Sequence, residues 1–252
     1  MTVVNEAADF ALDELCVVAC AEAFRGDGEI LASPIGLIPS LGARLARLTF
    51  APELLMTDGV ASLVLDQPDG SRVVEGWLPY RAIFDLVASG RRHVMMGASQ
   101  IDRFGNQNIA CIGDPRRPKA QLLGMRGAPG NTINHPTSYW IPSHSARSFV
   151  AQVDCVSGVG GNRAAALGVA GRFHALRRVV TNLAVLDFET PDRTMRVRSL
   201  HPGVRAEDVQ GQTGFPLSIA PDVATTRAPT ADELALLRGV LDPSGLRKKE
   251  LR

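Results

Sequence analysis

The stretch Gly97–Asn108, GASQIDRFGNQN, lies between two short apolar runs and decides how we interpret the rest of the chain. The runs before and after it, His93–Met96 and Ile109–Ile112, are each predicted to be buried strands. The Gly105-Asn106 pair is typical of a tight turn. Buried amides and carboxylates must find hydrogen-bond partners or face a cleft. The polar side chains in question are Gln100, Asp102, Asn106 and Asn108. From the residues alone, they belong either to a polar β-turn or to a binding site.

The composition is that of an ordinary globular protein. With 252 residues, of which 45% are hydrophobic and 21% charged, we expect one domain over residues 1–252 with a substantial core. A net charge of +1, nine Phe, two Trp and two Tyr do not favour a nucleic-acid or membrane partner. The acidic amino-terminal region lacks the basic segment of a signal peptide, and no apolar run approaches the ~18–20 residues of a membrane span. We expect a cytoplasmic protein.

Apolar periodicity alternates between helix and strand in the first half of the chain, which favours an α/β layer with parallel strands. The later part is predicted to be richer in strands. The expected helices are Asn5–Arg25, a helix that opens at Ser33-Pro34 and runs to Leu48, Pro79–Ala88, Glu207–Thr213 and Thr230–Leu241. The other expected strands are Glu29–Ala32, Glu53–Met56, Val60–Asp66, Arg147–Val156, Arg178–Thr181, Leu183–Phe188 and Thr194–Leu200, with an irregular stretch at Gly124–Ile141.

Several common catalytic motifs are missing from the sequence. There is no nucleophile elbow and no P-loop, and Gly158–Arg163 (GVGGNR) lacks the third glycine of a dinucleotide loop. The five histidines show no HxxxH spacing and the four cysteines no CxxC pair, so we expect no metal and reduced thiols. Ser143, His144 and Ser145 are chain neighbours, and neighbours on an extended chain point to opposite faces. We therefore do not expect a serine here to pair with His144 as nucleophile and base.

Five segments in order resemble the β subunit of the class I coenzyme A transferases. The first has the pattern GxxQIDxxGNxN, and the others are Gly124–Ala128 (GMRGA), Ile141–Asp154, Arg178–Phe188 and His201–Phe215. The resemblance covers nearly the whole chain and implies an α/β fold, with a mixed, largely parallel sheet flanked by helices. It also implies an α subunit as partner, in an α2β2 heterotetramer, because fused family members contain two related halves and this chain matches the second. It implies no cofactor beyond the CoA of the substrate.

One implied site residue follows a buried strand, at Thr57-Asp58-Gly59. In the family, a glutamate in the matching turn attacks the acyl-CoA thioester and then carries CoA. Asp58 stands at that position, and its side chain is one methylene, roughly 1.5 Å, shorter. A misplacement of about 1 Å can cost ~100-fold in rate. Asp58 is therefore either a catalytic carboxylate with shortened reach or a turn residue.

The second implied site is Gly124–Ala128. In the family a Gly-x-Gly-Gly-Ala loop offers backbone N–H groups to the thioester oxygen, as an oxyanion hole. Gly127 keeps that backbone freedom, whereas Arg126 replaces a family glycine, and its guanidinium suits a carboxylate or an enolate. A surface arginine is the alternative interpretation. We predict that the substrate site is completed by Gln100, Asn106, Asn108 and Gly124.

Both departures indicate chemistry on a CoA thioester without transfer of CoA to the enzyme. The MTDG and GMRGA segments resemble a hydrolytic branch of the family that opens the last steroid ring of a cyclic keto acyl-CoA. That resemblance implies retro-Claisen-like C–C cleavage, in which water adds to the ring ketone and the α subunit supplies the base. Two alternatives remain open: a genuine CoA transferase in which Asp58 attacks, and a non-catalytic scaffold subunit.

Overall fold

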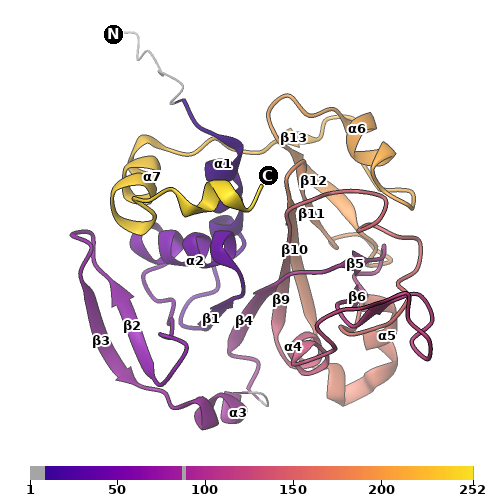
Figure 1. Ribbon diagram of the computed structural model, residues 1–252, viewed down its shortest axis with the longest axis horizontal. Helices are drawn as coiled ribbons and strands as arrows, with labels where there is room; N and C mark the ends of the chain where they lie inside the picture. Colours follow the sequence, from indigo (N-terminus) through magenta and orange to yellow (C-terminus); the bar gives the residue numbers. More distant parts are fainter. Residues whose placement is uncertain (1–8, 87–88, 252) are drawn as a thin grey trace.

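A mixed seven-stranded sheet forms the centre of the computed structural model, which describes residues 9–86 and 89–251 (Figure 1). The strand order is β1-β4-β9-β10-β11-β12-β13. Pairing is parallel from β1 to β10, antiparallel on both sides of β11, and parallel again between β12 and β13. This confirms the expected α/β fold with a mixed, largely parallel sheet. The strands are β1 (Leu31–Pro34), β4 (Arg92–Met96), β9 (Pro136–Ile141), β10 (Ala175–Thr181), β11 (Ala184–Asp187), β12 (Arg196–Leu200) and β13 (Ala224–Thr225).

Alternate residues of the central strands face two separate cores, because side chains of a strand point to opposite faces in turn. Met95, Trp140 and Val180 pack with the helices α1 (Leu12–Glu22) and α2 (Leu37–Thr49) and with the segment that follows α7 (Ala231–Leu236). Their neighbours Val94 and Tyr139 belong to the core on the other face. In Figure 1 the three helices lie together on one side of the sheet. The opposite side carries α4 (Ala128–Asn134), α5 (Gly161–Ala164), the 3-10 segment η2 (Ala165–Gly171) and α6 (Ala206–Gly211).

A hairpin of two strands projects away from the central sheet, at the lower left of Figure 1. It consists of β2 (Ser62–Asp66) and β3 (Arg72–Trp77) and is followed by η1 (Tyr80–Ala82) and α3 (Ile83–Leu86). Ion pairs from α2 hold it in place, through Arg44 to Asp66 at 2.6 Å and through Arg47 to Glu75 at 2.5 Å. Large apolar side chains on this hairpin and the turn after it remain exposed, namely Val73, Val74, Trp77, Tyr80 and Phe84.

Two shorter hairpins follow β4 and organise the Gly97–Asn108 stretch. They are formed by β5 (Gln100–Ile101) with β6 (Gln107–Asn108), and by β7 (Cys111–Ile112) with β8 (Ala120–Gln121). Gly105 lies in the tight turn between β5 and β6 with φ +80°, as expected, but Asn106 does not share the positive φ predicted for the Gly-Asn pair. The strand expected over Ile109–Ile112 is therefore broken, with residues 109 and 110 outside β6 and β7.

The structure corrects several sequence-based predictions in the first half of the chain. The first helix begins at Leu12, and the predicted start at Asn5 lies outside the described residues. Ser33 and Pro34 end β1 rather than open a helix, and α2 begins after Gly36, whose φ of +111° favours glycine. Residues 53–56 contribute an isolated bridge at Leu55 instead of a full strand. The predicted helix Pro79–Ala88 is reduced to η1 and α3, and its last two residues are not among those described.

The later corrections involve two missed elements and one that was wrongly predicted. The stretch predicted to be irregular, Gly124–Ile141, contains α4 and the buried strand β9. The strand expected over Arg147–Val156 is absent from the described structure, where these residues form turns with one bridge at Phe149. By contrast, the capping box at Thr230 and Glu233 is confirmed at the start of α7. The four cysteines are free in the structure.

A buried ion cluster fixes α1 to the carboxyl-terminal 3-10 segment η4 (Leu246–Lys249). The Arg247 side chain is 4% exposed and pairs with Asp13 at 2.8 Å, Glu14 at 2.7 Å and Asp242 at 2.9 Å. Hydrogen bonds, first of all from Arg238, lower the pKa of Glu14 to about 2 against the effect of burial. A carboxyl group with a lowered pKa stabilises the fold above its ordinary pKa of 4.5 and loses that contribution as the pH falls towards 2. Urea unfolding at several pH values should therefore show a free energy of unfolding that falls over this range.

Arg247→Met should lower the free energy of unfolding at neutral pH by about 3–5 kcal/mol, because it leaves three buried carboxylates without their shared cation. Urea unfolding monitored by circular dichroism measures the change. Arg205→Met is the matched control, since Arg205 makes only an exposed pair with Asp208, and a change within about 0.5 kcal/mol is expected. Equal effects of the two substitutions would contradict a structural role for the cluster.

Candidate functional site

The amides of the Gly97–Asn108 stretch form a closed hydrogen-bond network rather than an open binding surface. Gln100 donates to the Asp154 carboxylate at 3.0 Å and accepts from the Asn108 side chain at 2.8 Å. Asn108 is fully buried and also bonds the backbone of Ala110 and Cys111. The structure therefore places Gln100 and Asn108, two of the predicted site residues, in a hydrogen-bond network that shapes the loops next to β4.

Asp102 and Asn106 form a second part of this network and lie beside a surface pocket. The Asp102 carboxylate accepts from the Asn106 side chain at 2.9 Å, and Asn106 in turn accepts from the Gly160 backbone N–H at 2.9 Å. Burial raises the pKa of Asp102, although the hydrogen bonds from Asn106 oppose that effect. A pocket of about 320 Å³ borders both side chains, with Arg103 and Arg163 also in its lining. Asn106, one of the predicted substrate-binding residues, thus lies beside a cavity.

Asp58 caps the turn that leads from residues 54–56 into the β2–β3 hairpin. Its Oδ1 atom accepts three backbone hydrogen bonds, from Val60 at 2.8 Å and from Ala61 and Ser62 at 3.0 Å each. These bonds, led by that from Ser62, lower the pKa of Asp58 to about 2. The carboxylate is exposed and stays ionised at neutral pH, with one oxygen engaged in the turn.

The Gly124–Ala128 loop has an unusual backbone at its centre. Gly124 has φ +83°, and Arg126 has φ +47°, a left-handed conformation that it shares with Arg193 alone among the described non-glycine residues. Such a conformation costs of order 1 kcal/mol and tends to occur at functional sites. Arg126 and Gly127 are exposed, and Gly127 directly precedes α4. The loop therefore presents a guanidinium and a glycine backbone to the outside of the isolated chain.

Interactions of Asn131 connect this loop to β4 and reveal residues that the sequence did not single out. The Asn131 side chain lies within 3.9 Å of the Met96 sulfur, and its Oδ1 accepts from Arg92 at 2.9 Å. Arg92 also donates to the Ser33 hydroxyl at 2.8 Å. His135, at the end of α4, is 1% exposed and both of its ring nitrogens lack a hydrogen-bond partner. An arginine directly before the apolar run HVMM was the sequence signal that could have pointed to this cluster.

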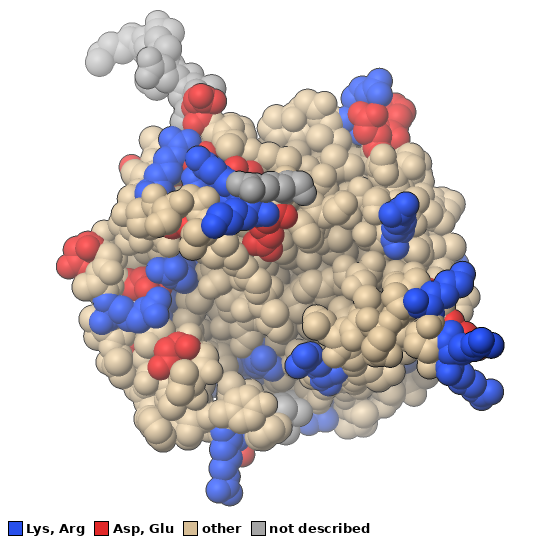
Figure 2. All heavy atoms as spheres, viewed as in Figure 1, with Lys and Arg blue, Asp and Glu red and all other residues tan. Residues whose placement is uncertain are grey.

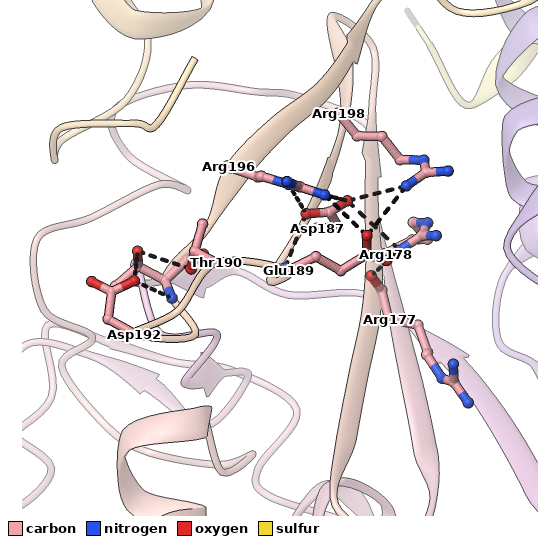
Figure 3. A network of polar contacts seen from close by, with 9 residues as sticks. Arg177, Arg178, Asp187, Glu189, Thr190, Asp192, Arg196 and Arg198 are labelled. Atoms are coloured by element: carbon pink, nitrogen blue, oxygen red, sulfur yellow. Dashed lines mark hydrogen bonds and ion pairs between the residues drawn. The ribbon is translucent and has the colours of Figure 1, made fainter. Parts of the chain in front are cut away.

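A second group of arginines, formed by Arg178, Arg196 and Arg198 on β10 and β12, pairs with Asp187 and Glu189 (Figure 3). Arg196 contacts the buried Asp187 at 2.7 Å, and Arg178 contacts Glu189 at 2.8 Å. Burial disfavours ionisation of Asp187, but the arginines lower its pKa overall. Arg178 also lines a pocket of about 450 Å³ between α1 and the strands β10–β13. Because these arginines already have carboxylate partners, we assign the network a structural role and not a ligand-binding one.

Comparison with known proteins identifies the family of this chain. The model of the family described as "Coenzyme A transferase" matches residues 80–212, more than half of the chain. The chain therefore belongs to the coenzyme A transferase family. None of the helices in residues 9–86 and 89–251 combines the length and apolar character needed to cross a bilayer.

The relatives within the family differ in their named activities. The chain is 54% identical over 240 residues to the cholesterol ring-cleaving hydrolase IpdB subunit of Rhodococcus jostii, covering 94% of this chain and 95% of the relative. It is 32% identical over 246 residues to a subunit of the 3-oxoadipate CoA-transferase of Pseudomonas knackmussii, covering 92% and 93%. The crystal structure of Rhodococcus jostii IpdAB matches with a TM-score of 0.90 at 52% identity, covering 97% of this chain and 99% of that one.

Proposed function

We propose that this chain is the β subunit of a hydrolase that opens the last steroid ring of a cyclic keto acyl-CoA during cholesterol or steroid degradation. The observation that carries the proposal is the 54% identity, over 94% of the chain, to a subunit named for cholesterol ring cleavage. Identity to the transferase subunit is much lower, at 32%. The exposed Arg126 in the Gly124–Ala128 loop supports chemistry on a thioester anion.

The reaction would proceed by retro-Claisen-like cleavage. Water adds to the ring ketone, the bond between that carbon and the α-carbon of the thioester breaks, and its electron pair passes into the thioester as an enolate. The former ketone carbon becomes a carboxylate, and the α-carbon is protonated. Arg126 and the Gly127 backbone N–H would hold the negative thioester oxygen. The base that activates water would come from the α subunit, and no cofactor is required beyond the CoA of the substrate.

The partner is an α subunit of the same family, in an α2β2 assembly in the cytoplasm. The hairpin and the turn after it expose Trp77, Tyr80 and Phe84, and the candidate loop exposes Leu123 and Met125. Exposed apolar groups of this size are typical of interfaces. Expressed alone, the chain is expected to aggregate, whereas a monodisperse monomer in light scattering would contradict an obligate partner.

The proposal is tested with the co-purified complex and a cyclic keto acyl-CoA thioester. Mass spectrometry should detect a ring-opened acyl-CoA that has gained one water, and neither subunit alone should form it. A complex that binds the thioester and leaves it intact would refute the hydrolase function.

Asp58 distinguishes the hydrolase from a genuine transferase. A transferase would attack the thioester with Asp58 and form an enzyme–CoA thioester, which hydroxylamine or borohydride traps. The proposal expects no adduct, and the three hydrogen bonds to Asp58 Oδ1 agree with a role in the turn. An adduct on Asp58 would establish the transferase mechanism.

Gly127→Val is expected to lower kcat roughly tenfold or more while the thermal midpoint of the complex changes little. A Cβ atom at Gly127 would meet the Asn131 side chain at an ordinary 3.6 Å, and the φ of −83° suits any residue, so the fold should accept the substitution. The branched side chain would crowd the proposed oxyanion donor. Turnover and thermal unfolding check the two halves of this prediction. Unchanged turnover would show that the loop is not the oxyanion site.

A further inference from the structure

Arg92 differs from the other recessed arginines because it has no acidic partner. It is half-buried at the start of β4 and donates to two neutral oxygens, those of Ser33 and Asn131. Within residues 9–86 and 89–251, no carboxylate forms an ion pair or hydrogen bond with it. Arg47 and Arg247 are more deeply buried, and each pairs with at least one carboxylate. A recessed guanidinium without a counterion is expected to attract an anion.

His135 provides a second, independent sign of a missing ligand. Its side chain is almost completely buried at the end of α4, and neither ring nitrogen has a partner. Buried polar atoms in proteins are nearly always hydrogen-bonded to protein or to ordered water, so both ring nitrogens are available to a group from outside the chain. Burial and the charge of Arg92 lower the pKa of His135 to about 4. The imidazole is therefore neutral at pH 7, adds no second positive charge beside Arg92, and can both donate and accept a hydrogen bond.

The position of this cluster joins it to the candidate loop. Asn131, which accepts from Arg92, lies on α4, and a Cβ placed on Gly127 would lie 3.6 Å from the Asn131 amide nitrogen. β1, β4 and α4 approach one another there in Figure 1. Figure 2 shows the same face of the molecule with a hollow in its middle. The hollow separates the part that contains α2 and the β2–β3 hairpin from the part that contains α4, and basic side chains lie in its lower part.

We propose that Arg92, supported by Asn131 and accompanied by His135, binds an anionic oxygen group of the thioester substrate, separate from the reacting oxygen held at Arg126. The inference rests on the proposed function, because the anion belongs to the same acyl-CoA. Two parts of such a molecule carry this chemistry: a carboxylate on the acyl group and a phosphate of CoA. Arg92 presents a planar fork of donors that fits either.

Calorimetric binding to the purified complex tests the inference without requiring turnover. The ligands are glutaryl-CoA, which has a free acyl carboxylate, pentanoyl-CoA, which lacks one, free CoA, and pantetheine, which lacks the phosphates of CoA. The variant is Arg92→Gln. Arg91→Gln is the matched control, because Arg91 is the exposed neighbour and pairs with Glu29 at 3.7 Å. Thermal unfolding of each complex verifies that it remains folded.

Arg92→Gln should weaken binding roughly 10- to 100-fold, the loss expected for charge-assisted hydrogen bonds. If the loss is confined to glutaryl-CoA, the anion is the acyl carboxylate. If it extends to pentanoyl-CoA and free CoA but spares pantetheine, the anion is a phosphate. Arg92→Lys should recover part of the lost affinity. Unchanged affinities, an equal loss for pantetheine, or the same loss in Arg91→Gln would overturn the inference. Failure of the wild-type complex to cleave a keto thioester would refute the proposed function. The ratio of the affinities of the variant and the wild-type complex could still be measured, because binding does not require turnover.

Discussion

Arg126→Ala in the co-purified complex should lower kcat roughly 100- to 1000-fold, the usual effect of removing one donor from an oxyanion site. The expectation follows from the position of Arg126 at the exposed centre of the Gly124–Ala128 loop and from its left-handed backbone. The protein maintains this unfavourable conformation at an arginine instead of a glycine, which supports a function for the side chain. Steady-state kinetics with a cyclic keto acyl-CoA measures the change.

Two control variants separate catalysis from folding in this experiment. Arg116→Ala removes an exposed arginine from the Asp114–Pro118 turn and should leave turnover unchanged. Arg126→Gly should be as inactive as Arg126→Ala but about 1 kcal/mol more stable than the parent, because glycine accepts the positive φ. Unchanged turnover of Arg126→Ala, with the complex assembled, would favour a scaffold subunit.

Gly160→Ala should destabilise the fold by roughly 3 kcal/mol, as overpacking against rigid groups does. A Cβ atom on Gly160 would lie 2.5 Å from the Phe104 carbonyl oxygen and 2.6 Å from the Asn106 nitrogen, both of which are backbone atoms. The contact also carries the hydrogen bond from Gly160 to the Asn106 side chain. Chemical denaturation of the complex measures the loss.

Gly239→Ala is the matched control for that substitution, because an added Cβ there meets nothing within 4 Å. It should change the free energy of unfolding by no more than about 1 kcal/mol. Similar stabilities of the two variants would mean that the Gly97–Asn108 stretch does not depend on its close packing with residues 158–160.

The sequence predicted strands best where apolar residues alternate or cluster between clear turn signals. His93–Met96 became β4, and the turn at Pro191-Asp192 separates β11 from β12 as expected. The strand β9 was missed because it begins at Pro136 and includes Thr137 and Ser138, whose side chains are buried by tertiary contacts that no local pattern reveals. The false strand at Arg147–Val156 had the composition of a strand but pairs only through one bridge.

The site was predictable in part, for reasons that differ between its residues. The dense amides of Gly97–Asn108 had to be satisfied or face a cleft, and the structure satisfies Gln100 and Asn108 internally. The loop with Arg126 could be located from the resemblance, but its left-handed backbone could not. The cluster around Arg92 depends on a residue from each of three segments, so its lack of a counterion emerges only from the folded arrangement.

The central claim is that an arginine and a glycine loop stabilise a thioester anion while CoA stays on the substrate. The most direct test is the intact mass of both subunits and of the acyl-CoA pool during turnover of a cyclic keto acyl-CoA by the complex. The account predicts a ring-opened thioester that has gained one water, still attached to CoA, and subunits of unchanged mass. A subunit mass increased by covalently bound CoA, located at Asp58, would contradict it.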